Sequence, residues 1–145
     1  MTPEADGRGV VQAIGRALRQ ARMAAGDIQY VNLHGVASDA ADPAETAGIR
    51  RAFDGRLDRL STSATKPVTG YLLGASGALE AVITTLALER RLIPPTINFT
   101  EAAPGCDLDY TAGAARPYPL TGALSINAGF GGRNSCLALR RWEGT

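Results

Sequence analysis

The sequence predicts an α/β fold in which helices lie on both faces of a mixed β-sheet that ends in an antiparallel hairpin. Helical segments alternate with short β-branched segments in the order α-β-α-β-α-β-β, which is typical of parallel β-α-β crossovers. A glycine-rich turn at residues 129–132 joins the last two predicted strands and favours a hairpin there. The chain has 145 residues, the size of one ordinary domain, so we expect residues 1–145 to form a single unit.

The first two predicted elements are a helix and a strand. Residues 9–24 place apolar side chains on one face and arginines away from it, as in an amphipathic helix that Gly26 ends. Residues 28–33 are rich in β-branched and aromatic side chains and predict a short strand. A second short strand is predicted at residues 59–63.

The helix between these two strands has a strong start signal. Asp42 is predicted as its N-cap, Pro43 as its first residue and Glu45 as the acidic residue that completes a capping box. We expect this helix to extend to about Phe53.

The second half of the chain begins with a helix predicted at residues 75–91. This helix is apolar nearly all round, so we expect it to be buried. A pair of prolines ends it, and residues 96–119 are expected to form a loop. Residues 120–127 and 134–142 are the predicted strands of the hairpin.

Composition argues against several classes of protein. The chain has 15 basic and 14 acidic residues, so it lacks the charge excess of proteins that bind nucleic acid or anionic membranes. No apolar stretch is long enough to span a bilayer and no secretory signal is present, so we expect a cytoplasmic protein. Cys106 and Cys136 are too few for a disulfide scaffold and are expected to be free thiols. No spacing of potential ligands resembles a metal site.

Two single residues are candidates for chemistry. His34 is the only histidine, and it directly follows a predicted strand, where catalytic groups often lie in α/β folds. A buried histidine held by a backbone carbonyl is the structural alternative. Lys66 is the only lysine beside 14 arginines, which raises the question of what an ammonium does there that a guanidinium cannot.

Longer motifs are more informative than either residue alone. The segments NLHGVASDAADPAET, STSATKPVTGYLLGASGALEA and NAGFGGRNS each place a distinctive residue at a strand end or a tight turn. Together with PPTIN at 94–98 and GCDLDY at 105–110, they resemble the C-terminal half of β-ketoacyl-acyl-carrier-protein synthases, the thiolase-fold condensing enzymes of fatty-acid and polyketide synthesis. The resemblance covers residues 7–139 and implies the C-terminal half of a thiolase-like fold.

The resemblance implies catalytic roles for four matched positions. His34 would be the first active-site histidine, whose neutral ring stabilises the enolate formed when a malonyl thioester loses CO₂. Lys66 would be the active-site lysine, and Glu80 its buried carboxylate partner. The backbone N–H of Phe130, in the GFGG turn, would donate to the oxyanion of the acyl thioester.

The same resemblance implies substrate contacts. Ser38 would contact the pantetheine arm of the carrier, and Gly129 and Gly131 would line the substrate site beside the phenylalanine of the turn. Val36 stands where the family has a threonine, so a hydroxyl is missing from the pantetheine channel.

Two further departures from the family pattern concern the chemistry itself. Tyr71 stands where the family has its second histidine, and a phenol with an ordinary pKa of about 10 is a poor acid or base at pH 7. The family's nucleophilic cysteine lies in the N-terminal half, so we expect neither Cys106 nor Cys136 to be the nucleophile.

These observations leave three functional hypotheses open. The leading one is a subunit of a split ketosynthase, an acyltransferase whose nucleophilic cysteine comes from a partner chain carrying the N-terminal half. The second is a non-catalytic partner that resembles a chain-length factor, and the third is a fragment of a longer chain. Acyl carrier protein is the expected second partner, a higher-order dimer is the expected assembly, and no cofactor is expected beyond the carrier's phosphopantetheine.

We also expect the domain to lack its first strand. In thiolase-type halves a strand precedes the first helix, and we expect its place to be inside the sheet. Without it the neighbouring strands would have unpaired edges, so the chain should not fold stably alone.

Overall fold

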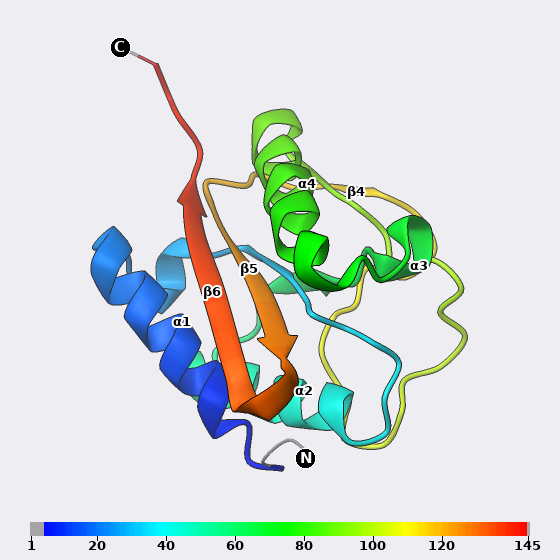
Figure 1. Cartoon of the computed structure of the whole chain (residues 1–145). Helices are drawn as coiled ribbons and strands as arrows, with labels where there is room; N and C mark the ends of the chain where they lie inside the picture. The colour runs from blue at the N-terminus through cyan, green and yellow to red at the C-terminus, as the bar shows by residue number, and fades with distance from the viewer. Residues whose placement is uncertain (1–4, 145) are drawn as a thin grey trace.

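The computed structural model describes residues 5–144 and has a four-stranded sheet between helices (Figure 1). The strands are β1 (Tyr30–Asn32), β2 (Ser61–Ser63), β5 (Gly122–Gly129) and β6 (Arg133–Arg140), and their order across the sheet is β2-β1-β5-β6. β1 is parallel to both β2 and β5, whereas β5 and β6 are antiparallel. The predicted α/β class, the mixed sheet and the terminal hairpin are therefore confirmed.

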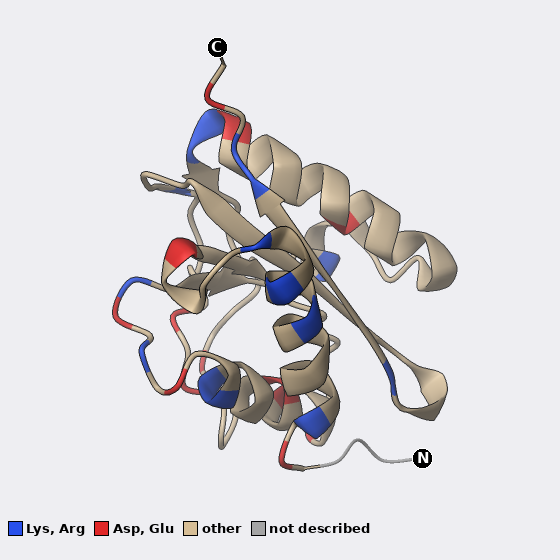
Figure 2. Ribbon diagram, turned by 90° about the vertical axis from the view of Figure 1, so that its left-hand side faces the viewer, with Lys and Arg blue, Asp and Glu red and all other residues tan. Residues whose placement is uncertain are grey.

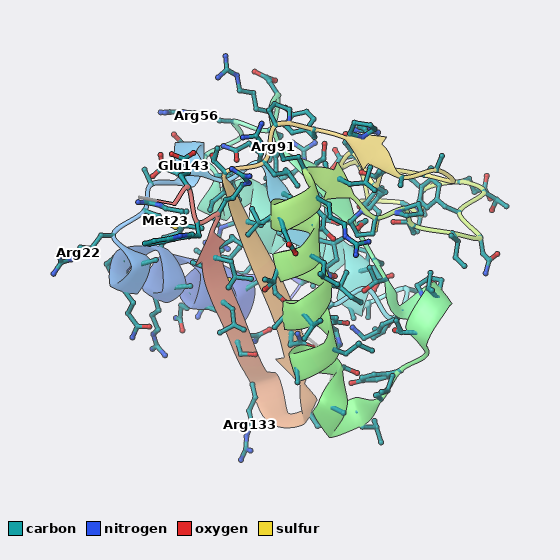
Figure 3. All side chains as sticks on the ribbon, turned by 90° about the horizontal axis from the view of Figure 1, so that it is seen from above. Arg22, Met23, Arg56, Arg91, Arg133 and Glu143 are labelled. Carbon is teal, nitrogen blue, oxygen red and sulfur yellow. The ribbon has the colours of Figure 1, made fainter. Side chains whose placement is uncertain are left out.

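Three main helices cover the two faces of the sheet. α1 (Arg8–Ala21) and α2 (Ala41–Ala52) lie on one face and α4 (Ser76–Arg90) on the other, with the β5–β6 hairpin between α1 and α4 in Figure 3. Because side chains alternate along a strand, Val31 faces the α1–α2 core and Tyr30 faces α4. This is the predicted α-β-α layering.

Short elements occupy segments for which the sequence predicted no regular structure. Two-residue strands β3 (Leu92–Ile93) and β4 (Arg116–Pro117) form a second, antiparallel sheet. The remaining elements are four single-turn helices: η1 (Ala25–Asp27), α3 (Lys66–Thr69), η2 (Leu73–Ala75) and η3 (Phe130–Gly132). α1 ends earlier than predicted, at a left-handed Arg22 (φ 52°) and not at Gly26.

The predicted capping of α2 is wrong. The N-cap is Ala40, not Asp42, and it makes no side-chain capping bond. The Asp42 carboxylate instead accepts the backbone N–H of Val36, at 3.2 Å. Glu45 likewise bonds backbone groups of the preceding loop. Both acidic side chains therefore fix the β1–α2 connection and do not cap the helix.

The expectation that α4 is buried on all sides is also wrong for this chain. Its sheet-facing side is covered, but Val82 is 56% exposed and Leu86 is 39% exposed on the opposite side. The described residues thus leave an apolar helix face in contact with solvent.

The sheet has no gap at its centre, so the predicted internal position for a missing strand is wrong. β1 pairs directly with β5, from Tyr30 opposite Ala123 to Asn32 opposite Ser125. Any further strand could join only at the outer edges. At the β2 edge, the Thr62 N–H already donates a hydrogen bond to the Asp109 carbonyl. That the domain lacks a strand, and that it is unstable alone, stay predictions.

Candidate active site

The site lies at the carboxyl ends of the parallel strands. His34 follows β1, Lys66 begins the turn after β2, and Asn127 lies near the end of β5. Parallel strands bring these ends to one edge of the sheet, which is the usual position of functional groups in α/β folds. Glu80 reaches the same place from α4. The structure therefore brings together residues that are 14 to 93 positions apart in the chain.

Lys66 is a buried ammonium with a partner for each of its three N–H groups. It donates to the Glu80 carboxylate at 2.5 Å and to the His34 carbonyl, and its Nζ lies 3.5 Å from His34 Nδ1. The Lys66 and Glu80 side chains are 6% and 2% exposed. An ammonium has three donors and no acceptor, so this arrangement uses it completely. Lys66 therefore holds His34 in place.

The environment of His34 keeps its ring neutral. Burial lowers its pKa to about 4, the Lys66 charge acts in the same direction, and a side-chain hydrogen bond with Asn127 opposes them. Because Lys66 can only donate, Nδ1 must be the acceptor, and the ring proton therefore lies on Nε2. The result is a neutral imidazole whose one N–H donor is Nε2–H.

Glu45 is a site residue whose role we did not predict. Its buried carboxylate accepts the N–H of His34 at 2.7 Å and that of Gly35 at 3.0 Å. The peptide between these residues thus donates to Glu45 through its N–H and accepts from Lys66 through its carbonyl. Burial raises the pKa of Glu45 to about 7. The sequence shows an acidic residue eleven positions after His34, but its place early in a predicted helix indicates a cap.

Tyr71 covers the histidine. Its ring meets that of His34 edge-on, with centroids 5.7 Å apart at 82°, and Lys66 Nζ lies 5.5 Å from the Tyr71 centroid. Tyr71 also lines a groove of about 400 Å³ together with Leu73, Asn127 and Phe130, whereas His34 is not among the lining residues. Tyr71 therefore contacts the imidazole and lines the groove.

Comparison with known proteins assigns this arrangement to a family. Residues 1–100 match the family "Beta-ketoacyl synthase, C-terminal domain". The chain belongs to this family. The ketosynthase domain is 40% identical over 141 residues to 3-oxoacyl-[acyl-carrier-protein] synthase 2 of Synechocystis sp., covering 97% of this chain and 34% of that protein.

Solved structures agree with the assignment of the ketosynthase domain. A type II polyketide ketosynthase, solved in complex with its acyl carrier protein, superposes with a TM-score of 0.94 at 30% identity, over 99% of this chain and 35% of that one. The ishigamide ketosynthase/chain length factor gives 0.90 at 31% identity, over 97% and 34%. The chain thus spans about a third of the length of the proteins it matches.

The expected substrate-contacting residues of the ketosynthase domain lie in two loops. Val36 and Ser38 are half-buried in the β1–α2 loop, where the Ser38 hydroxyl accepts the N–H of Ala41 at 3.2 Å. Gly129 lines the groove beside Phe130, whose side chain is 89% exposed. Gly131 lies in the same turn and adopts a left-handed φ of 76°, which favours glycine.

Neither cysteine is among the residues that line the groove. Cys106 is buried and Cys136 half-buried, and both are free thiols. Burial raises the pKa of Cys136 to about 12, which keeps its thiol protonated at neutral pH. Within residues 5–144 no three potential ligands cluster to hold a metal, and no helix in that range is long and apolar enough to cross a membrane.

Proposed function

We propose that the chain is the C-terminal part of a β-ketoacyl-acyl-carrier-protein synthase that extends acyl chains in fatty-acid or polyketide synthesis. It would supply His34, Lys66 and the Phe130 N–H, while a partner polypeptide supplies the nucleophilic cysteine. The observation that carries the proposal is the fully bonded Lys66, which fixes a neutral His34 with its proton on Nε2.

The proposed reaction has three steps. First, the partner's thiolate attacks an acyl thioester, the carrier thiolate leaves, and the oxyanion formed on the way is stabilised by the Phe130 N–H. Second, a malonyl thioester loses CO₂, and the electron pair left behind forms an enolate that His34 Nε2–H stabilises. Third, the enolate carbon attacks the acyl-cysteine, a carbon–carbon bond forms, and the cysteine thiolate leaves.

The substrates and partners in this proposal follow from the family assignment. Acyl and malonyl groups would arrive on the phosphopantetheine arm of acyl carrier protein, so the reaction would need no other cofactor. The solved relative that carries its acyl carrier protein supports this partner. We further propose that the complete assembly is a higher-order dimer.

The alternative is a non-catalytic subunit similar to a chain-length factor. Tyr71 favours this alternative, because a phenol in contact with His34 stands where a second imidazole donor is expected. Val36 favours it too, since its side chain offers no hydroxyl to a pantetheine arm. The intact Lys66–Glu80 pair and the bonded His34 favour catalysis.

The deciding experiment measures acyl loading and condensation separately in the purified complex, whose partner is first identified by intact mass. If Tyr71 impairs the site, Tyr71→His should raise condensation and leave loading unchanged, and Tyr71→Phe should behave like the wild type. If the phenol is a working donor, Tyr71→Phe should abolish condensation and Tyr71→His should not improve it. Fast wild-type condensation that neither substitution alters would contradict both accounts.

His34→Ala provides the test of the catalytic assignment. Loss of one preorganised donor to a developing oxyanion costs roughly 10²- to 10³-fold in rate, so malonyl decarboxylation should fall by about that factor. Unchanged malonyl turnover in His34→Ala would mean that His34 is structural or that the complex does not decarboxylate.

A further inference from the structure

Asn127 is the β5 residue that lies level with His34. The β1–β5 pairing places Asn32 opposite Ser125, and His34 and Asn127 each follow two residues later in the same direction. Adjacent strands lie about 4.8 Å apart, so the two segments bring these side chains within reach of each other. Odd-numbered β5 residues face α4, as Ala123 does in its core cluster, and Asn127 continues that face. Asn127 therefore lies beside His34 on the α4 side of the sheet.

The amide of Asn127 has one end engaged and one end available. A side-chain hydrogen bond joins Asn127 and His34. Lys66 occupies Nδ1 of the imidazole, so the ring offers Nε2–H, which the amide oxygen Oδ1 accepts. The hairpin residues 122–139 include no acidic residue that could bind the amide nitrogen, and Figure 2 shows no red segment on the hairpin. The N–H groups of Nδ2 are thus left for a ligand.

The groove gives a ligand access to this amide. Asn127 lines the groove together with Phe130, whereas His34 is not among the lining residues. Gly77, at the start of α4, also lines the groove and lies next to the Asn127 amide without a side chain that would cover it. Tyr71 has a single O–H, whereas a carboxamide nitrogen carries two N–H donors and keeps them at every pH near neutral. Asn127 can therefore supply the donor that a second histidine would provide.

We propose that Asn127 is a catalytic residue of the ketosynthase domain, whose Nδ2–H donates to the malonyl thioester oxygen beside His34 Nε2–H. The proposal rests on the proposed function and adds a second donor to its decarboxylation step. In that step the bond to the departing CO₂ breaks, its electron pair becomes the enolate double bond, and the thioester oxygen takes the negative charge. Two N–H donors on that oxygen stabilise the charge as it develops.

A rotation of the amide reconciles this role with its bond to His34. Without substrate, Oδ1 accepts the His34 Nε2–H. When the thioester oxygen enters, a half-turn about the Cβ–Cγ bond of Asn127 exchanges Oδ1 and Nδ2, so that both residues donate to the same oxygen. Torsions of this kind have broad minima, so the rotation meets little resistance.

NMR of the only histidine in the chain tests the contact between the two side chains. The purified complex is labelled with ¹⁵N-histidine, and the His34 signals are identified by their loss in His34→Ala. Asn127→Asp places a negative charge beside the ring and should raise the pKa of His34 by at least about one unit. Asn98→Asp makes the same change at an exposed residue of the 96–119 loop and should leave that pKa unchanged. An unaltered His34 pKa in Asn127→Asp would overturn the proposal.

Malonyl decarboxylation and acyl loading, measured separately on the same complex, test the donor role. Asn127→Asp keeps an acceptor for His34 but has no N–H, and Asn127→Leu has neither. Both variants should lower decarboxylation by roughly 10²- to 10³-fold, the usual cost of one donor, while acyl loading stays at the wild-type rate and shows that the site is folded.

The two ways in which these measurements can fail are distinguishable. Wild-type decarboxylation that persists unchanged in Asn127→Leu would overturn the donor role and leave the proposed function standing. A wild-type complex that does not decarboxylate a malonyl thioester would refute the proposed function and the donor role together. In that case the His34 pKa in Asn127→Asp would still decide whether the two side chains are in contact.

Discussion

Replacing Glu45 with glutamine should change how the stability of the domain depends on pH. Glu45 is buried, and its folded-state pKa is raised from 4.5 to about 7. Between these values the folded state binds a proton that the unfolded state does not, so this residue makes stability fall as pH rises. At about 1.4 kcal/mol per pH unit, the change across this window is up to about 3 kcal/mol.

His34 acts in the opposite direction. Its pKa is lowered from 6.5 to about 4, so between these values the unfolded state binds the extra proton and stability rises with pH. In the wild type the two effects oppose each other between about pH 4.5 and 6.5. In Glu45→Gln only the effect of His34 remains, and stability should rise over this range.

The measurement is urea unfolding of wild type and Glu45→Gln at pH 4.5, 5.5, 6.5 and 7.5. Glu89→Gln, which changes an exposed carboxylate near the end of α4, is the control and should follow the wild type. The difference in unfolding free energy between Glu45→Gln and wild type should grow with pH, in favour of the variant. Parallel pH profiles for the two proteins would refute the assignment of a raised pKa to Glu45.

Two further substitutions test the packing of the site and the sheet. Glu80→Leu leaves Lys66 buried without a carboxylate and should cost about 3–5 kcal/mol in urea unfolding. The double substitution Lys66→Met with Glu80→Leu should recover most of that loss, and equal losses in both variants would contradict the ion-pair argument. Gly122→Ala should lower the free energy of unfolding by about 1–3 kcal/mol, because its Cβ would collide with the Asp27 carbonyl. Gly26→Ala, whose Cβ would face open space, should change the free energy of unfolding little, and equal melting temperatures for the two variants would contradict this reasoning.

The sequence predicted the elements whose patterns depend on near neighbours. The periodicity of residues 9–24 predicted α1 correctly, apart from a shift at its end. The apolar run near residue 120 likewise predicted β5, with shifted ends. The two-residue strands β3 and β4 were missed, because so short a pairing leaves no periodic signal. Helix periodicity also shows that α4 is apolar all round without showing which side this chain covers.

Only part of the candidate site could be predicted, because local sequence patterns show single residues but not which distant groups they contact. His34 and Lys66 could be singled out as the only residues of their kinds, and the structure places them in contact. The role of Glu45 could not be predicted, because an acidic residue early in a helix serves equally well as a cap or as an acceptor for a distant loop. The position of Tyr71 over His34 depends on the turns of residues 66–75, which no local pattern specifies.

The burial of Lys66 also makes it an internal reporter of unfolding. It is the only lysine in the chain, and its amine is enclosed by Glu80 and His34. An amine-directed acylating reagent should therefore modify the folded protein only at its α-amino group. A second modification, detected by mass spectrometry, would count the molecules whose candidate site has opened, without any dye or engineered probe.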